Sequence, residues 1–335
     1  MRHMLVRAMA PVIGMAILGI ASASQGLAAE PTKINLRLAW IAGAVDIPLF
    51  VAASKGYFKD EGLDVNIVDG NGSTGTIQAV GSGDFEIGIA GLGALAQAQQ
   101  AAGADTLIAV AGLLQKDPTS VISLKGSGIT QPKDIEGKRF GTDAANFEDG
   151  MIKAFAEANG VDFSKVNVII INGNNDRVAL LKGDVDFING WANPDGDKVA
   201  AKAPIEKPLL FADYGVNLLG SSVIVRKDFL AKNEAAVRGF LAALQKGKAA
   251  TVADQNGAFA LFMKARPDSD EAEIKLEMRV MPQYEHTAAS AGKPYGWVAQ
   301  SDVEQTISLL EKYSGMKPGL KPDSIYNGSY LPASN

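Results

Sequence analysis

Residues 62–89 place a loop rich in glycine, serine and threonine between two apolar segments. The centre of the loop reads DGNGSTGT, a composition that leaves backbone amides open to a ligand at the start of a short helix expected over 74–83. Ser73 and Thr74 add hydroxyls that could cap this helix or bind the ligand. A nucleotide phosphate loop is excluded, because Thr-Ile follows Gly75 where Lys and then Ser or Thr would be needed. Two interpretations remain, a small-molecule site and a capped turn without a ligand.

Chemistry based on cysteine or histidine has little material in this sequence. The 335 residues include no cysteine and two histidines, His3 and His286. Disulfides, thiolate metal sites and cysteine nucleophiles are therefore excluded. His3 lies in a leader segment, so one histidine remains, and we expect neither an ordinary catalytic triad nor a histidine-based zinc site. We expect no enzyme activity, no metal and no cofactor.

The elements that must position these residues alternate between strand and helix. Apolar strand-like segments occur at 33–40, 63–68, 85–91, 166–172, 185–190 and 221–226. Residues 47–62 predict one helix, with Leu49, Phe50, Ala53 and Tyr57 on one stripe. Beyond residue 227 the pattern is mostly helical, over 233–254, 256–266, 271–281 and 302–315. Such alternation predicts an α/β fold with largely parallel sheets.

An internal repeat of this pattern predicts two similar α/β lobes. GLDVNIVDGNG (62–72) is matched by GVDFSKVNVIIINGN (160–174), and IQAVGSGDFEIGIAG (77–91) is matched by VALLKGDVDFINGW (178–191). The offset of roughly a hundred residues is too long for a solenoid. Each lobe would offer an Asn-Gly loop at the carboxyl end of a strand, the edge at which open α/β sheets bind ligands. Chance similarity between two generic βαβ units is the alternative.

The N-terminus has the order of a secretory signal. Two arginines precede the apolar run PVIGMAILGIASA, and the small residues of SQGLAAE follow it. We expect a signal peptide at 1–28 cleaved after Ala28, with cleavage after Ala23 or Ala29 as alternatives. The apolar run is short for a membrane anchor. Without a cysteine for lipid attachment, the mature protein should be free in the periplasm, and we expect a monomer.

The charge balance argues against nucleic acid as a partner. Without the two leader arginines, 30 basic side chains face 37 acidic ones. Binding to a phosphate backbone depends on an excess of Lys and Arg, which this chain does not have.

Five segments resemble the periplasmic solute-binding proteins of ABC importers: IPLFVAASKGYFKDEGLDVNIV, SGDFEIGIAG, DIEGKRFGT, NGVDFSKVNVIII and ALLKGDVDFINGW. The most similar group includes binders of nitrate, alkanesulfonates, taurine and the pyrimidine precursor of thiamine. The resemblance spans about residues 33–314 and implies the two-lobed type II periplasmic binding protein fold with a hinge. Lobe one would comprise 29–120 plus 220–335, and lobe two 121–219, with crossovers near SVISLK and GSSVIV. The implied partners are a small-molecule ligand and a membrane permease with its ATPase.

If the family pattern holds, loops at the strand ends line the cleft between the lobes. The ligand-binding candidates are Trp40, Asp46, Ser73, Thr74, Gly91, Thr142, Asp143, Asn146, Phe147, Glu148, Asn172, Asn189, Trp191 and Asp195. The two tryptophans suggest stacking on a flat ring. Arg177 is the main basic residue nearby, and it could instead cap its helix or pair with Asp176.

The resemblance also indicates a ligand. Thiamine-precursor binders of this group often carry an aromatic residue and then an acid after the second-lobe strand, as GWANPD does here with Trp191 and Asp195. We therefore expect a nitrogen heterocycle such as an aminopyrimidine, with a sulfonate, taurine-like or aromatic carboxylate ligand as the alternative. Two other classes of function stay open. One is a periplasmic sensor subunit, and the other is a pyrimidine-precursor synthase, whose eukaryotic members use histidine and a cysteine-rich cluster that this chain lacks.

Overall fold

The computed structural model describes Met1 and residues 30–102, 106–143, 150–172 and 175–333. The chain divides into two units, Met1–Glu30 and Pro31–Asn335, and the fold below is that of the second unit. The expected signal segment 1–28 therefore lies, apart from Met1, outside the described residues. In the described parts of the chain, no helix has both the length and the apolar character that a membrane span requires.

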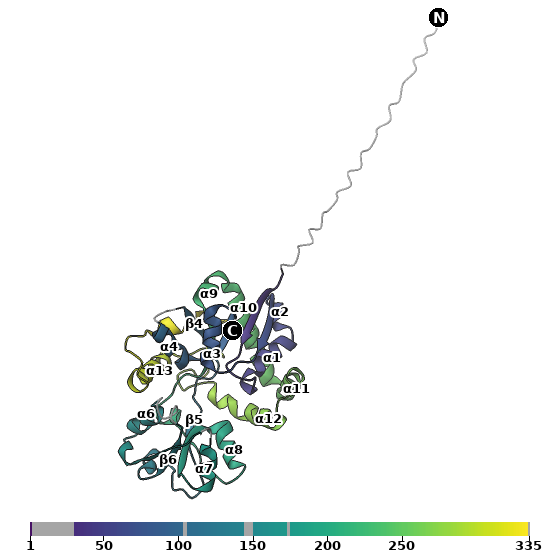
Figure 1. Cartoon of the computed structure of the whole chain (residues 1–335). Coiled ribbons are helices and arrows are strands. Elements are labelled where there is room, and N and C mark those ends of the chain that lie inside the picture. Colours follow the sequence, from purple (N-terminus) through teal and green to yellow (C-terminus); the bar gives the residue numbers. More distant parts are fainter. Residues whose placement is uncertain (2–29, 103–105, 144–149, 173–174, 334–335) are drawn as a thin grey trace. The chain divides into compact units, whose positions relative to one another are not determined.

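The second unit has a two-domain α/β architecture built on two five-stranded sheets (Figure 1). Sheet A has the order β2-β1-β3-β10-β4, with β10 antiparallel to its neighbours. Its strands are β1 (Thr32–Arg37), β2 (Leu63–Val68), β3 (Ile87–Gly91), β4 (Leu107–Gly112) and β10 (Ser221–Arg226). Sheet B has the order β7-β6-β8-β5-β9, with β5 antiparallel. Its strands are β5 (Thr119–Ser123), β6 (Arg139–Thr142), β7 (Asn167–Ile170), β8 (Phe187–Trp191) and β9 (Leu209–Leu210).

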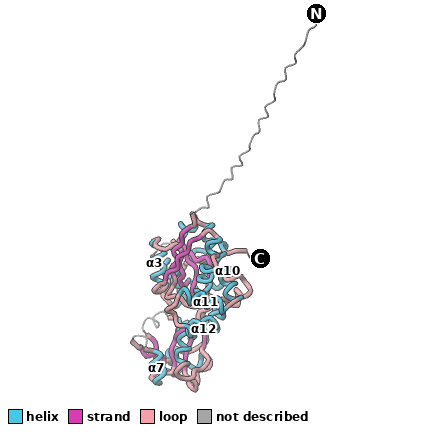
Figure 2. Tube along the Cα trace, turned by 90° about the vertical axis from the view of Figure 1, so that its right-hand side faces the viewer, coloured by secondary structure: helices cyan, strands magenta, loops and turns pink. Residues whose placement is uncertain are grey.

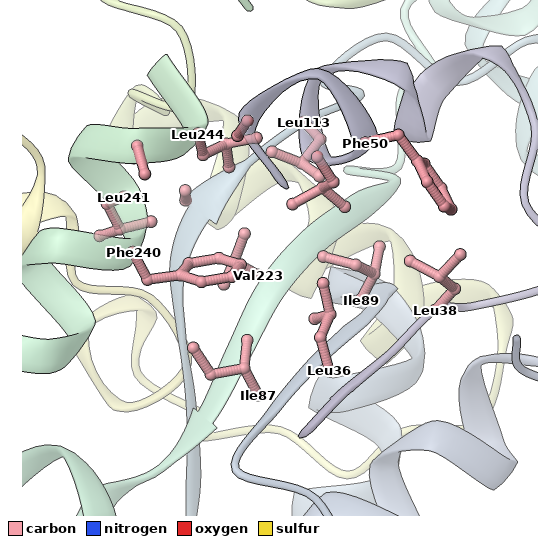
Figure 3. Close-up of a cluster of buried hydrophobic side chains, with 14 of the residues drawn as sticks. Leu36, Leu38, Phe50, Ile87, Ile89, Leu113, Val223, Phe240, Leu241 and Leu244 are labelled. Atoms are coloured by element: carbon pink, nitrogen blue, oxygen red, sulfur yellow. The ribbon is translucent and has the colours of Figure 1, made fainter. Parts of the chain in front are cut away.

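Sheet A is buried on both faces. Successive residues of a strand point to opposite faces of the sheet, and in sheet A the residues of both sets belong to a hydrophobic core. Along β10, Val223 joins one core and Ile224 the other. The first core is covered by α1 (Ile47–Ser54), α2 (Tyr57–Asp60), α9 (Lys227–Lys232), α10 (Glu234–Ala253), α11 (Gln255–Ala265) and α12 (Glu271–Val280). The second is covered by α3 (Ser73–Ser82), α4 (Leu92–Ala102), α13 (Gln300–Tyr313) and α14 (Pro322–Ile325). Figure 3 shows strand residues such as Ile87 and Val223 in one cluster with Phe240, Leu241 and Leu244 of α10.

Sheet B, whose ribbons are drawn mainly in teal in Figure 1, has its own two cores. Phe140 of β6 stacks on Phe187 of β8 with ring centres 4.9 Å apart, and both are fully buried. In the described part of this half, three helices and a short π-helical segment accompany the sheet: α6 (Met151–Ala158), α7 (Asp176–Lys182), α8 (Asp197–Ala200) and η4 (Ala192–Gly196). Figure 2 shows α3 and α10 beside the strands of sheet A and α7 beside those of sheet B.

Short 3-10 turns complete the connections. They are η1 (Ala44–Asp46), η2 (Pro132–Ile135), η3 (Phe163–Lys165), η5 (Phe211–Tyr214), η6 (Met281–Tyr284) and η7 (Gly328–Tyr330).

The strand orders confirm the expected α/β fold with two similar halves. The triplet β2-β1-β3 of sheet A corresponds to β7-β6-β8 of sheet B, and the repeated sequence segments form β2, α3 and β3 in one half and β7, α7 and β8 in the other. The single helix expected over 47–62 was wrong. It is split into α1 and α2 at Gly56, whose φ of 80° is left-handed and cannot continue an α-helix.

Two crossover segments connect the sheets, one between β4 and β5 and one between β9 and β10. Asn217 of the second crossover bridges to the first, since its Oδ1 accepts a hydrogen bond from the Asp117 amide (2.8 Å) and its Nδ2 donates to the Gln115 carbonyl (2.8 Å). Strand β5 starts at Thr119, so the boundary expected after Ser120 falls inside a strand of sheet B. An apolar crossover sequence does not reveal which sheet it joins, and the lobe boundaries stay a prediction.

Candidate ligand-binding cleft

Two cavities adjoin at the crossovers, where they share Asp117, Trp191 and Leu218. The first has a volume of about 380 Å³ and is lined by Ala39, Trp40, Gly72, Ser73, Gly91, Gly93, Ala94, Leu114, Asp117, Pro118, Trp191, Leu218, Leu219, Gly220 and Ser221. The second, about 430 Å³, is lined by Asp117, Thr119, Asp143, Met151, Asp176, Arg177, Asn189, Gly190, Trp191, Asp195 and Leu218. We call the two cavities together the cleft. It draws on residues from both sheets, at the strand ends where open α/β sheets bind ligands.

The DGNGST loop forms part of the wall of the first cavity because it is bonded to the end of β1. The Gly72 amide donates to the Ala39 carbonyl (2.7 Å) and the Gly70 amide to the Trp40 carbonyl (3.1 Å). A Cβ atom on Gly70 would lie 1.9 Å from the Leu38 carbonyl oxygen, so only glycine permits this close approach. Gly72, with φ of 119°, occupies the position before α3.

Of the two roles open to the loop hydroxyls, capping of α3 is not observed. Gly72 has no side chain to offer at the cap position, and no side chain in the described residues caps this helix start. The Ser73 hydroxyl oxygen instead accepts a hydrogen bond from the Gly91 amide (3.0 Å), and the Thr76 hydroxyl donates to the Leu38 carbonyl (2.7 Å). The helix start therefore borders the cavity through Gly72 and Ser73, where its first amides can meet a ligand.

Two tryptophans border the first cavity from different sheets. Trp40 follows β1 and is 62% exposed, while Trp191 ends β8 and is 44% exposed. Trp191 also lines the second cavity. Large aromatic side chains left this open to solvent commonly mark binding surfaces, because covering them removes apolar area from water.

The second cavity is acidic. Four of its lining residues are carboxylates, Asp117, Asp143, Asp176 and Asp195, and one is basic, Arg177. Arg177 forms its ion pair with Asp195, whose Oδ2 also accepts a hydrogen bond from the Trp191 amide (3.1 Å). The suggested partner Asp176 is therefore replaced by Asp195. Asp195 is therefore not a free acceptor for a ligand. It holds the Arg177 side chain and the turn that follows Trp191.

Asp46 lies outside both cavities. It is 5% exposed, and its Oδ2 accepts a hydrogen bond from the Gly43 amide (3.0 Å). Burial, and then the nearby carboxylates of Glu277 and Asp69, raise the pKa of Asp46 to about 7. Glu277 in turn accepts a hydrogen bond from the Ala44 amide (2.9 Å). These carboxylates hold the segment that follows β1 and carries Trp40.

A model of the NMT1/THI5-like family matches residues 44–258, well over half of the sequence. The chain belongs to the NMT1/THI5-like family. The matched span contains most of the cleft, from the DGNGST loop to the second crossover.

Relatives of this NMT1/THI5-like chain include enzymes and binding proteins. The 4-amino-5-hydroxymethyl-2-methylpyrimidine phosphate synthase of Uromyces fabae is 29% identical over 248 residues, 70% of this chain and 71% of the relative. The riboflavin-binding protein RibY of Chloroflexus aurantiacus is 24% identical over 318 residues, 90% of this chain and 89% of the relative. Among solved structures, the periplasmic aliphatic sulphonate binding protein SsuA from Escherichia coli aligns with a TM-score of 0.67 at 18% identity, covering 90% of this chain and 99% of SsuA.

These comparisons confirm the resemblance and the periplasmic binding protein fold, and they correct one expectation. The expectation that the chain is not an enzyme was wrong, because several curated relatives carry the same synthase name. A lack of cysteine and a scarcity of histidine exclude particular nucleophiles and metal sites. They do not exclude catalysis in a family whose fold can place carboxylates and a bound ligand in one cleft.

Only some of the residues expected to bind the ligand line the cleft. Trp40, Ser73, Gly91, Asp143, Asn189, Trp191 and Asp195 line it. Thr74, Thr142 and Asn172 do not line it. Thr142 is buried, and its hydroxyl donates to the Asp143 carbonyl (3.3 Å). Asn172 is exposed, and its carbonyl accepts a hydrogen bond from Asn175 Nδ2 (2.9 Å). Asn146, Phe147 and Glu148 lie outside the described residues. Within the described ranges, no group of three His, Asp or Glu side chains is arranged to hold a metal ion.

Sequence reasoning missed the crossovers of this NMT1/THI5-like chain as part of the site. Asp117, Pro118, Leu218 and Gly220 all line the first cavity. The available signal was the pair of crossover sequences, since segments that join two lobes must pass beneath the cleft between them.

Proposed function

We propose that this chain is the substrate-binding component of an ABC importer, which captures a small molecule with a flat, nitrogen-containing ring and delivers it to a membrane permease. One observation carries the proposal: Trp40 and Trp191, from different sheets, border the same 380 Å³ cavity. Two indole faces can cover a flat ring, and the amides at the start of α3 can bind its polar substituents. The pyrimidine and riboflavin in the names of relatives support such a ligand, and the sulphonate bound by SsuA is the alternative.

We further propose that the ligand favours a closed arrangement of the two halves. The segment η4 directly follows Trp191, and its Asn193 Oδ1 accepts a hydrogen bond from the hydroxyl of Tyr284, on the sheet-A side (2.9 Å). Lys198 of α8 pairs with Glu273 of α12 at 3.4 Å. A ligand that stacks on Trp191 acts on the segment that also carries these contacts, so it can favour the state in which they form.

Trp191→Ala is expected to weaken binding of 4-amino-5-hydroxymethyl-2-methylpyrimidine by about fivefold to a hundredfold, because aromatic stacking on a base contributes about 1–3 kcal/mol. Isothermal titration calorimetry measures the change. Trp297→Ala is the matched control, since Trp297 lines a separate cavity with Tyr326 and should leave the affinity unchanged. Equal losses in the two variants, or no loss in either, would contradict binding in the cleft.

We also propose that the protein is exported and cleaved. N-terminal sequencing of the periplasmic fraction is expected to begin near Ala29, because Gly26 and Ala28 are the small residues that precede the expected cleavage point. A membrane-bound form that still begins at Met1 would rule this out.

A second candidate function, synthesis of the phosphorylated pyrimidine, is favoured by the names of several relatives. Mass spectrometry of the small molecules released after incubation of the protein with candidate substrates distinguishes the two candidate functions. A binding protein returns its ligand at unchanged mass, and a synthase generates a phosphate ester that was absent at the start.

A further inference from the structure

We propose that Asp117 is the carboxylate that anchors the ligand. The cleft then selects a ring that carries a positively charged group over one that carries a phosphate or a sulfonate. The inference rests on the proposed function, because it concerns the same cleft. It assigns a specificity-determining role to a crossover residue, and it differs from what the phosphate and sulphonate in the names of relatives would suggest.

The position of Asp117 is the first argument. It is one of three residues shared by the two cavities, so a ligand that extends from the tryptophans into the acidic half must pass it. Its backbone amide donates to Asn217 Oδ1 of the other crossover (2.8 Å), and its Oδ1 accepts from the Thr119 amide (2.7 Å). The carboxylate is thus held in place at the junction of both crossovers before any ligand arrives. Preorganised groups lose less freedom on binding.

The remaining bonding capacity of Asp117 is the second argument. A carboxylate has about four lone-pair sites, and the amide and hydroxyl of Thr119 use two of them, which leaves about two for a ligand. Burial raises the pKa of Asp117, and this effect outweighs the lowering by its bonds to Thr119. A cationic ligand group would compensate the partly buried charge that these bonds leave incompletely stabilised.

Asp195 is less suited to this role. Its carboxylate is already paired with Arg177 and accepts the Trp191 amide (3.1 Å). A ligand cation that approached Asp195 would compete with a guanidinium held in the same cavity. Asp195 therefore positions Trp191, whereas Asp117 is the one of the four lining carboxylates that borders both cavities.

The charge of the second cavity is the third argument. Among its described lining residues, four are carboxylates and one is an arginine, so this part of the lining has an excess of negative charge when all are ionised. A phosphate or sulfonate placed there would meet like charges at close range. A cation placed there gains attraction from the same groups.

A matched series on one ring tests the inference. The probes are 4-amino-2-methylpyrimidines that carry an aminomethyl group (cationic), a hydroxymethyl group (neutral) or a hydroxymethyl phosphate (anionic) at position 5. The wild-type protein is expected to bind the cation about tenfold more tightly than the neutral ring, and the phosphate at least about tenfold more weakly. Calorimetry at neutral pH measures all three.

Asp117→Asn is expected to weaken binding of the cationic probe by about tenfold to a hundredfold. The phosphate probe should bind as well as it does to the wild-type protein, or better. Asparagine keeps an oxygen acceptor for the Thr119 amide, so the crossover should stay folded, as a thermal melt checks. Asp213→Asn is the matched control. Asp213 pairs with Lys116 (2.5 Å) beside the crossovers but lines neither cavity of the cleft, so its loss should change each affinity by less than about twofold.

The possible outcomes separate the inference from the proposed function. Tighter binding of the phosphate than of the cation, or equal effects of Asp117→Asn on all three probes, overturns the inference while the cleft remains the binding site. If no probe binds the wild-type protein, or if Trp191→Ala leaves all affinities unchanged, the proposed function fails and the inference fails with it.

Discussion

Phe140→Ala is expected to lower the free energy of unfolding by about 3–5 kcal/mol, because it removes a fully buried aromatic ring from a close-packed core. Phe140 stacks on Phe187 at a ring-centre distance of 4.9 Å, between two strands of sheet B. Urea unfolding followed by circular dichroism measures the loss. Ile170→Ala is the matched control in the same sheet, since Ile170 is 50% exposed on β7 and should cost less than about 1 kcal/mol. Similar losses in both variants would mean that the stacked pair is not a core contact.

Asp46→Asn is expected to stabilise the protein at pH 8, by up to about 4 kcal/mol, and to have little effect near pH 4. Burial raises the pKa of Asp46 from 3.8 to about 7, so the folded protein binds this proton more tightly than the unfolded chain does. The wild-type protein therefore loses stability as the pH rises from about 4 to about 7, where the buried carboxyl ionises. The neighbouring charges are Glu277 and Asp69, which oppose this ionisation, and Arg266, which favours it.

The measurement for Asp46 is the melting temperature as a function of pH. Asparagine does not ionise and its oxygen can still accept the Gly43 amide, so the two curves should separate progressively from about pH 4 to about pH 7. Asp64→Asn, on the exposed part of β2, should run parallel to the wild-type protein throughout. A variant of Asp46 that is less stable than the wild type at pH 8 would show that the ionised carboxylate is needed in the fold.

Much of the fold could be predicted because it depends on local patterns. The apolar run SSVIVR is β10 from its first residue to its last, and the repeated segments occupy equivalent strands of the two sheets. Prediction failed where a single backbone conformation decided the outcome, as at Gly56, which divides the expected helix into two. Amphipathic periodicity shows which face of a helix is buried. It does not show where a single residue adopts a left-handed backbone conformation that ends the helix.

The site was less accessible to prediction because it depends on which side chains meet. The sequence indicates acids and tryptophans after strands, and Trp40, Trp191 and Asp195 do line the cleft. It does not indicate that Arg177 pairs with Asp195, that Asp46 is buried behind its loop, or that Asp117 stands where the cavities join. Each of these depends on contacts between residues that are far apart in the chain or on opposite sides of a turn.

The place of β10 in sheet A affects the order in which the chain can fold. β10 lies between β3 and β4, and its Ser221 is paired with Gly91, a separation of 130 residues. A chain synthesised as far as Leu210 already contains every strand of sheet B, but its β3 and β4 still have to be held about 9.5 Å apart for a strand that does not yet exist. Contacts this distant in sequence form slowly. The half that comes second in the sequence can therefore be completed first, and the half that begins the chain is closed by a strand made much later.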